Sequence, residues 1–367
     1  SIIPIVMPKW GLAMKEGSVT SWLKNEGDKV NKGETFVEIE TEKVVNEFES
    51  PEEGILLKKV IENDIKVPVG SLIAILGKEN TDTNEIEKFV EDFQSNFTPP
   101  SDDEEDSNLE KIIQIKNIDI NYLQLGENNS KNIVFVHGFG GDLNNWMFNQ
   151  EDLSSNFNTF SIDLPGHGKS SKNIDQGNLE YLSDIVKDFC NQNNLEKICL
   201  VGHSLGGGIC LNIALVNPEL VESLILISPI GLGKEIDNYV EEFIKSESRR
   251  DLKPQLEKLY FNKELITRDL VNEVLKFKRL DGVEKALQII KDETLIEDNN
   301  QKTFLGDKIE TLKSKISIIW GENDEIIPNS HIKELPSNVE THIFKESGHM
   351  SHIEKSKEVN EIIVKLN

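Results

Sequence analysis

Three side chains, Ser204, Asp324 and His349, have the types and the order along the chain that nucleophilic acyl transfer needs. Ser204 is the central residue of Gly-His-Ser-Leu-Gly, which satisfies the G-x-S-x-G pattern of a strand-to-helix turn. The motif follows the apolar run 198–201 and precedes a helix-like stretch over 207–216. Because such a turn lifts the serine hydroxyl above a sheet, we expect Ser204 to be the nucleophile.

The nucleophile requires a base, and the base requires an acid that orients it. Asp324 ends the stretch Trp-Gly-Glu-Asn-Asp after an apolar run, and His349 follows the last expected strand. With Ser204 they complete the triad in order. We therefore expect an active enzyme and not a hydrolase fold that has lost its catalytic residues. Other polar residues are weaker candidates. Asp163 lies in the glycine-rich turn Asp-Leu-Pro-Gly-His-Gly, which we expect to be structural, and Ser228 ends another strand without offering a carboxylate. The weaker base candidates, in helical or strand contexts, are His331, His342 and His352.

Two backbone N–H groups are expected to stabilise the negative charge on a reacting carbonyl oxygen. One belongs to Leu205, at the start of the helix that follows the nucleophile. The other belongs to Phe139 in His-Gly-Phe-Gly-Gly, which follows the first long strand. His137 of the same segment could act as a base, but we expect it to hold the loop in place.

The elements around these residues predict a mainly parallel sheet over residues 111–367. Apolar runs alternate there with helical stretches, a pattern typical of strands buried between two layers of helices. Helical periodicity replaces this alternation over 231–306, which predicts an inserted helical lid. The expected strands are 133–136, 160–162, 198–201, 223–227, 316–319 and 341–344.

Residues 1–79 contain short strand-like runs separated by glycine, asparagine, aspartate and proline turns, the pattern of a small all-β domain. Lys43 lies between two such runs in Glu-Thr-Glu-Lys-Val, so its amine is expected at an exposed hairpin tip. Gly27 precedes this lysine by 16 residues and Gly54 follows it by 11. Exposure is what an enzyme that modifies the lysine would need.

This region resembles lipoyl domains, which are small flattened β-barrels that carry lipoate on a hairpin lysine. Met-Pro-Lys-Trp-Gly near the start of the chain and the two glycines contribute to the resemblance. Biotinyl domains share the fold, but methionines generally flank their lysine, whereas Glu42 and Val44 flank Lys43. The resemblance therefore favours lipoate attached to Lys43 by a lipoate ligase. A flexible arm of this kind delivers a thioester to a second active site.

Residues 80–110 read as an acidic linker, with Pro99-Pro100 followed by five consecutive acidic residues over 102–106. Apolar residues at helical spacing over 82–97 interrupt it and predict a short helix. Such a helix could dock a partner protein, or it could pack against a flanking domain. We favour packing against a flanking domain.

The composition excludes several classes of partner. The formal net charge of −25 disfavours nucleic acid and anionic membranes, and no apolar run approaches the roughly 20 residues that span a bilayer. The first residues carry no export signal, and the three widely spaced cysteines suit reduced, buried thiols. We therefore expect a cytoplasmic protein. Because the histidines and cysteines lack ligand spacing, we expect no metal site.

Together, Lys43 in a lipoyl-like domain and Ser204 in an α/β-hydrolase-like domain resemble the dihydrolipoamide acetyltransferase components of acetoin dehydrogenase complexes. The resemblance implies that a thiamine-diphosphate-dependent acetoin dehydrogenase component loads an acetyl group on the lipoyl arm. It also implies that this chain passes that group to coenzyme A. Dihydrolipoamide dehydrogenase is a further implied partner, although the usual basic subunit-binding domain is missing and only 82–97 could replace it.

Two other functions stay open. A serine hydrolase of esters, thioesters or carbon–carbon bonds would use the same triad with water as acceptor. A non-enzymatic carrier and scaffold would require Ser204 to be catalytically inactive. Ordinary acyltransferases of dehydrogenase complexes have a different fold and a His-x-x-x-Asp-Gly motif. That motif is absent here, since no histidine stands four residues before Asp281 in Asp281-Gly282. The carrier-like domain favours acyl transfer.

Overall fold

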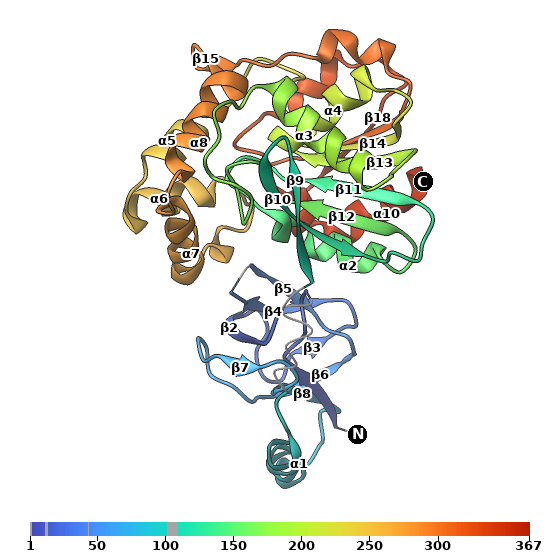
Figure 1. Cartoon of the computed structure of the whole chain (residues 1–367). Helices are drawn as coiled ribbons and strands as arrows, with labels where there is room; N and C mark the ends of the chain where they lie inside the picture. The colour runs from blue at the N-terminus through green and yellow to red at the C-terminus, as the bar shows by residue number, and fades with distance from the viewer. Residues whose placement is uncertain (1, 12–13, 43, 101–108) are drawn as a thin grey trace. The chain divides into compact units, whose positions relative to one another are not determined.

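The computed structural model describes residues 2–11, 14–42, 44–100 and 109–367, which fall into two units split between Asn108 and Leu109 (Figure 1). Each unit has its own hydrophobic core. No helix within the described ranges is long and apolar enough to cross a membrane.

The first unit is built from two four-stranded antiparallel sheets that share a core. One sheet has the order β1-β8-β6-β3 and the other β5-β4-β2-β7. Buried side chains such as Val19, Ile39 and Leu56 come from both sheets. The strands are β1 (Ile3–Val6), β2 (Glu16–Trp22), β3 (Lys29–Val30), β4 (Thr35–Glu40), β5 (Val45–Glu49), β6 (Gly54–Lys59), β7 (Val67–Pro68) and β8 (Leu72–Gly77).

Helix α1 (Thr83–Asn96) follows this unit and packs on it. The Asp82 side chain caps the helix by accepting a hydrogen bond from the N–H of Asn84, at 2.9 Å. Ile86 and Val90 are buried against residues of β8. The expected short helix is therefore present, and its apolar side is covered by its own unit, not left free for a partner.

The second unit contains an eight-stranded sheet in the order β18-β17-β14-β13-β11-β12-β10-β9. The six strands from β18 to β12 are parallel, and β10 and β9 extend the edge in antiparallel pairing. Continuous apolar runs make the central strands suitable for burial on both faces. The strands are β9 (Glu110–Ile115), β10 (Ile118–Leu125), β11 (Asn132–Val136), β12 (Asn158–Ile162), β13 (Ile198–His203), β14 (Val221–Ile227), β17 (Lys315–Gly321) and β18 (Glu340–Phe344).

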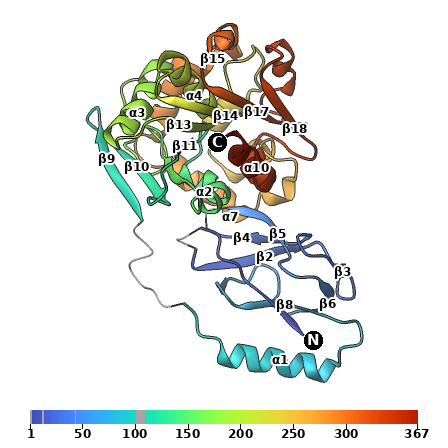
Figure 2. The same ribbon diagram turned by 90° about the vertical axis from the view of Figure 1, so that its right-hand side faces the viewer.

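Helices cover both faces of this sheet (Figure 2). Ile133, Val201 and Ile319 point to the face where α2 and α10 supply Leu153 and Val359. Helix α4 packs on the other side of β13 and β14, next to α3. The bounds are α2 (Met147–Leu153), α3 (Leu179–Gln192), α4 (Leu205–Val216), α9 (Ser351–Glu354) and α10 (Ser356–Leu366), with short 3-10 helices at η2 (Leu143–Trp146), η5 (Gly306–Thr311) and η6 (Asn329–Glu334).

A helical lid lies between β14 and β17, within the range predicted for it. Most of its helices are short and amphipathic, and their buried side chains include Phe243, Leu252 and Leu275. The elements are α5 (Tyr239–Lys245), α6 (Arg249–Glu257), η3 (Lys263–Leu265), α7 (Arg268–Lys278), α8 (Val283–Ile290), the π-helical turn η4 (Lys291–Leu295), β15 (Ile296–Glu297) and β16 (Asn300–Gln301).

Candidate active site

Ser204 lies at the turn between β13 and α4. Its backbone has φ +54° and ψ −113°, a conformation that non-glycine residues rarely adopt. A Cβ atom on Gly202 would lie 2.3 Å from the carbonyl oxygen of Gly206, and one on Gly206 would lie 2.1 Å from that of Val136. The turn is therefore too tight for a side chain at either glycine, which explains the motif around Ser204.

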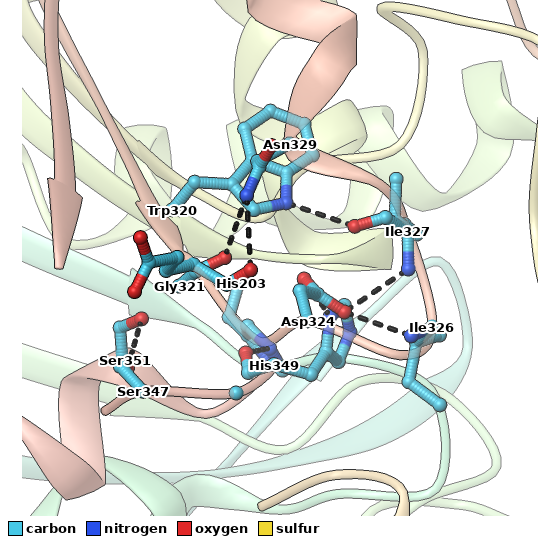
Figure 3. A network of polar contacts seen from close by, with 12 residues as sticks. His203, Trp320, Gly321, Asp324, Ile326, Ile327, Asn329, Ser347, His349 and Ser351 are labelled. Carbon is cyan, nitrogen blue, oxygen red and sulfur yellow. Dashed lines mark hydrogen bonds and ion pairs between the residues drawn. The ribbon is translucent and has the colours of Figure 1, made fainter. Parts of the chain in front are cut away.

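The structure brings Asp324 and His349 into contact (Figure 3). His349 Nδ1 lies 2.8 Å from Asp324 Oδ2, and the two side chains are 3% and 0% exposed. Asp324 Oδ1 accepts hydrogen bonds from the N–H groups of Ile326 and Ile327, at 2.8 and 3.1 Å. These donors orient the carboxylate, so that its second oxygen faces the imidazole. Since Nδ1 is engaged, Nε2 is the ring nitrogen left for proton transfer.

The loop that carries His349 passes very close to the end of β17 (Figure 3). A Cβ atom on Gly321 would lie 2.0 Å from the carbonyl oxygen of Gly348 and 2.4 Å from that of Ser347. The Ser347 hydroxyl also lies 2.8 Å from that of Ser351, at the start of α9. Only glycine at position 321 lets this loop bring His349 to the sheet edge where Asp324 follows β17.

His203 connects the turn that carries Ser204 to the His349 loop. Its Nε2 lies 2.8 Å from the carbonyl oxygen of His349, and the two ring centroids are 4.7 Å apart. Burial lowers the pKa of His203 well below 6.5, so the ring is neutral and Nε2 donates to that oxygen. The residue before Ser204 thus holds the backbone of His349. Within the described residues, no hydrogen bond joins the Ser204 hydroxyl to the His349 ring itself.

The two expected oxyanion donors lie beside Ser204. Leu205 is the first residue of α4, and a Cβ atom on Gly138 would lie 3.2 Å from Ser204 Cβ, which places the Phe139 segment against Ser204. In the part of the chain that the structure describes, neither the N–H of Phe139 nor that of Leu205 has a hydrogen-bond partner. Unpaired donors next to the hydroxyl suit the predicted role.

Two buried histidines hold the loop that carries Phe139. His137 Nε2 accepts a hydrogen bond from the N–H of Leu164 at 3.0 Å, and His167 Nε2 accepts one from Gly140 at 2.9 Å. Burial lowers the pKa of His137 to about 4 and that of His167 to about 3, so both rings stay neutral and can accept. His137 therefore has the structural contacts expected of it. His167 carries no sequence signal beyond its glycine-rich turn, and its contact with Gly140 follows only from the structure.

Asp163 joins three segments beneath this loop. Its carboxylate accepts hydrogen bonds from the N–H groups of Leu143 and Lys169, both at 2.8 Å, and from the side-chain amide of Asn121 at 2.9 Å. Burial and the nearby charge of Asp142 raise the pKa of Asp163 to about 7. These contacts are those of a structural residue.

The remaining histidines lie outside the Asp324–His349 pair. His331 and His342 each lie 2.8 Å from an oxygen of an exposed glutamate, whereas His352 is fully buried and packs against Trp146 with the rings tilted by 36°. None of these histidines is hydrogen-bonded to Asp324 within the described residues.

The predicted modification site, Lys43, lies outside the described residues. On either side of it, the N–H of Thr41 donates to the carbonyl oxygen of Val44 at 2.8 Å, and the N–H of Val44 donates to Thr41 Oγ1 at 3.1 Å. These bonds close the turn between β4 and β5, where Glu42 is exposed.

The three cysteines are free and buried. Burial raises the pKa of Cys190 to about 12 and that of Cys199 to about 11, so both stay as unreactive thiols. No cluster of three or more metal-binding side chains occurs among the residues whose positions are described.

Comparison with known protein families matches both units. The family described as biotin-requiring enzyme matches residues 3–76, and the family described as alpha/beta hydrolase fold matches residues 131–356. The predicted fold class, a small all-β lipoyl-type domain followed by an α/β-hydrolase domain with a helical lid, is therefore confirmed.

Two curated relatives match nearly the whole chain. The dihydrolipoyllysine-residue acetyltransferase component of the acetoin cleaving system of Cupriavidus necator is 34% identical over 369 residues, which cover 100% of this chain and 97% of the relative. Its counterpart from Pseudomonas putida is 36% identical over 97% of this chain and 96% of the relative. A solved serine hydrolase from Cycloclasticus zankles covers 69% of this chain and 95% of its own length, with 21% identity and a TM-score of 0.62, and this likeness shows the fold alone.

Proposed function

Because the chain belongs to the family of dihydrolipoyllysine-residue acetyltransferase components of acetoin cleaving systems, we propose that it transfers an acetyl group from a lipoyl arm on Lys43 to coenzyme A. The catalytic residues of this acyltransferase are Ser204, His349 and Asp324. The observation that carries this assignment is the buried His349–Asp324 pair, whose loop is hydrogen-bonded to His203, the residue before the nucleophile.

The carrier half of the proposal rests on the β4–β5 turn. The bonds between Thr41 and Val44 close a tight hairpin, and the exposed Glu42 beside Lys43 fits a tip that a lipoate ligase can reach. Lipoate bound there supplies a dithiol that carries the acetyl group as a thioester.

The first half of the reaction loads Ser204. Its Oγ attacks the acetyl carbonyl carbon while His349 Nε2 takes the hydroxyl proton, and Asp324 stabilises the resulting imidazolium. The N–H groups of Phe139 and Leu205 stabilise the charge that develops on the carbonyl oxygen. His349 then returns the proton to the departing sulfur as the carbon–sulfur bond breaks, which leaves the acetyl group as an ester on Ser204.

The second half uses the same residues in reverse. His349 takes the proton of the coenzyme A thiol, and the sulfur attacks the ester carbonyl. As the bond to Ser204 Oγ breaks, His349 returns the proton to that oxygen and acetyl-coenzyme A leaves. One thioester is consumed and one is formed, so the transfer requires no water, oxidant or reductant.

This role implies partner enzymes. A thiamine-diphosphate-dependent component that cleaves acetoin would supply the acetyl group. Dihydrolipoamide dehydrogenase would reoxidise the dithiol that remains after transfer. The names of the relatives, components of acetoin cleaving systems, support membership in such an assembly.

A serine hydrolase is the second candidate. The favouring observation is that a Ser-His-Asp triad on this fold can equally activate water, and the solved structure of similar fold is named a serine hydrolase. In that case the ester on Ser204 would be released as free acetate.

One experiment separates the two functions. The full-length lipoylated protein is loaded with acetyl groups, and acetyl-coenzyme A and free acetate are followed beside Ser204→Ala and the exposed-site control Ser330→Ala. Loss of the nucleophile should lower the transfer rate by roughly 10³-fold or more, and the control should retain it. A transfer rate that is unchanged in Ser204→Ala would contradict the proposal. A rate of acetate release that does not depend on coenzyme A would favour the hydrolase.

A further inference from the structure

All four arginines of the chain lie in the lid, at positions 249, 250, 268 and 279. The other basic residues among the 40 are lysines. Residues 245–279 contain ten basic and six acidic side chains, whereas the whole chain contains 40 basic and 65 acidic ones. The lid helices therefore form a locally positive region on a strongly negative protein.

Three of these arginines lie at one end of the helix pair α6 and α7, and we call them the arginine cluster: Arg249, Arg250 and Arg279. Arg249 and Arg250 begin α6, and Arg279 directly follows α7, which packs against α6 (Figure 1). The Arg279 guanidinium donates to the carbonyl oxygen of Glu247 at 3.1 Å, two residues before Arg249. The neighbouring Lys278 ammonium donates to the carbonyl oxygen of Ser246. These contacts bring the end of α7 to the start of α6.

The first two members of the arginine cluster have no internal partner. Arg249 and Arg250 are exposed, and among the described residues neither side chain forms an ion pair or a hydrogen bond. The nearest carboxylate in α6, that of Asp251, accepts a hydrogen bond from the Ser248 hydroxyl at 2.8 Å. Positive charge at a helix N-terminus opposes the helix dipole and is therefore unfavourable there. A bound anion would remove this repulsion.

Phe243 of the neighbouring helix α5 connects the end of α7 to the segment that carries Phe139. The Lys278 ammonium lies 5.2 Å from the ring centroid of Phe243, and the Phe243 ring lies 5.9 Å from that of Phe139, the expected oxyanion donor. A ligand held by the arginine cluster would therefore lie on a part of the lid that contacts Phe243, whose ring packs beside the Phe139 segment next to Ser204.

We propose that the arginine cluster binds the phosphate groups of coenzyme A. This inference rests on the proposed transfer to that acceptor. Coenzyme A carries its phosphates and its thiol at opposite ends of a long arm, so phosphates on the lid leave the thiol free to reach Ser204. A chain with net charge −25 repels such a polyanion unless a local basic site offsets the repulsion. The planar guanidinium, unlike lysine, binds phosphate oxygens in pairs.

Carboxylates of a protein surface, including those of the acidic first unit, are the competing ligand for the arginine cluster. Phosphate is favoured because the chain uses lysine for its basic charges everywhere outside the lid and places arginine only here. A docking role would slow acetyl delivery to every acceptor, whereas a phosphate site affects only acceptors that carry phosphate.

Direct binding tests the site without requiring turnover. Titration of the full chain with coenzyme A and with adenosine 3′,5′-bisphosphate should give a Kd at least tenfold higher for the triple variant Arg249→Gln/Arg250→Gln/Arg279→Gln, about 1.4 kcal/mol. Arg268→Gln is the matched control, because Arg268 is exposed and begins α7 at the opposite end, about 16 Å away along the helix. Unchanged binding in the triple variant, equal weakening in the control, or no binding to the wild type would each overturn the proposal.

Turnover with two acceptors distinguishes the phosphate site from a docking surface. The ratio of kcat/KM for coenzyme A to kcat/KM for pantetheine, which lacks the phosphates, should fall about tenfold in the triple variant. The Arg268→Gln ratio should match that of the wild type. An equal loss with both acceptors would assign the arginine cluster to protein docking and overturn the proposal. The triple variant could bind coenzyme A more weakly while the wild type releases only acetate. That combination would support the phosphate site and contradict the proposed acetyl transfer to coenzyme A.

Discussion

The N–H of His349 donates a hydrogen bond to the carbonyl oxygen of Leu259, 3.0 Å away in the lid. A second connection runs through Glu354 of α9, whose carboxylate accepts hydrogen bonds from the N–H groups of Gly348 at 2.8 Å and Phe261 at 3.1 Å. The backbone on both sides of the proposed base is therefore fixed to the segment that follows α6. A movement of this part of the lid would displace His349.

Replacement of Glu354 by glutamine should disturb both stability and catalysis. The amide nitrogen would face a backbone N–H donor in place of an acceptor, which should lower the free energy of unfolding by about 1–3 kcal/mol. Thermal unfolding and the kcat of acetyl transfer measure the two effects. Glu358→Gln is the control, since Glu358 is exposed and makes no ion pair within the described residues. Equal behaviour of the two variants would argue against this connection.

Gly321→Ala tests the close approach between β17 and the His349 loop. The added Cβ atom would collide with the carbonyl oxygens of Ser347 and Gly348, so the loop must move. A displacement of about 1 Å in a reacting group can lower a rate on the order of 10²-fold. We expect a loss of that size in kcat, beside a destabilisation of about 1–3 kcal/mol.

The matched glycine control is Gly306→Ala. A Cβ atom there would lie 3.2 Å from the exposed side chain of Phe304, which can turn away. Its activity and melting temperature should stay near those of the wild type. If Gly321→Ala retained full activity, the loop would not depend on this contact.

The sequence predicted the strands that carry long apolar runs and missed those that do not. Strands β9 and β10 join through Lys116 and Asn117, which both have positive φ, as the tight two-residue hairpin turn requires. A lysine is an unusual residue for that conformation, so the turn was not recognised from its residue types. Glu110, the first residue of β9, continues the acidic composition of the linker, so the start of the strand was not recognised either. The two-residue strands β3 and β7 carry too little pattern to be recognised from sequence.

The proposed triad could be named from the sequence because its members occur in local motifs. The residues that position them could not, because their contacts join segments far apart along the chain. His203 binds the backbone of a residue 146 positions away, and Glu354 binds Phe261, 93 positions away. No spacing rule relates such pairs. Their roles follow only from the tertiary structure.

Lys43→Arg should separate the carrier from the catalytic unit. Arginine keeps the positive charge but cannot form the amide that attaches lipoate, so the variant should gain no adduct mass in cells able to lipoylate. Acetyl transfer from the arm should be abolished, whereas hydrolysis of a small ester at Ser204 should persist. Lys66→Arg in the same unit is the control and should carry the adduct. Lipoate on the Lys43→Arg protein would refute the assignment of Lys43 as the attachment site. Biotin on the native protein would show that the predicted cofactor, lipoate, is wrong.

The buried Asp163 should make stability depend on pH. Burial and Asp142 raise its pKa from 3.8 to about 7, so the folded protein holds this proton more tightly than the unfolded chain does. The carboxyl therefore contributes stability that is complete below about pH 4 and is lost as the pH rises to about 7. Asp163→Asn cannot titrate, so the wild type should exceed the variant in stability by more at about pH 5 than at about pH 8. Melting temperatures at both pH values measure this, with the exposed Asp307→Asn as a control that should show no such change. An equal deficit for Asp163→Asn at both pH values would instead show that Asp163 is already ionised at about pH 5 in the folded protein, with its charge stabilised by the three donors around it.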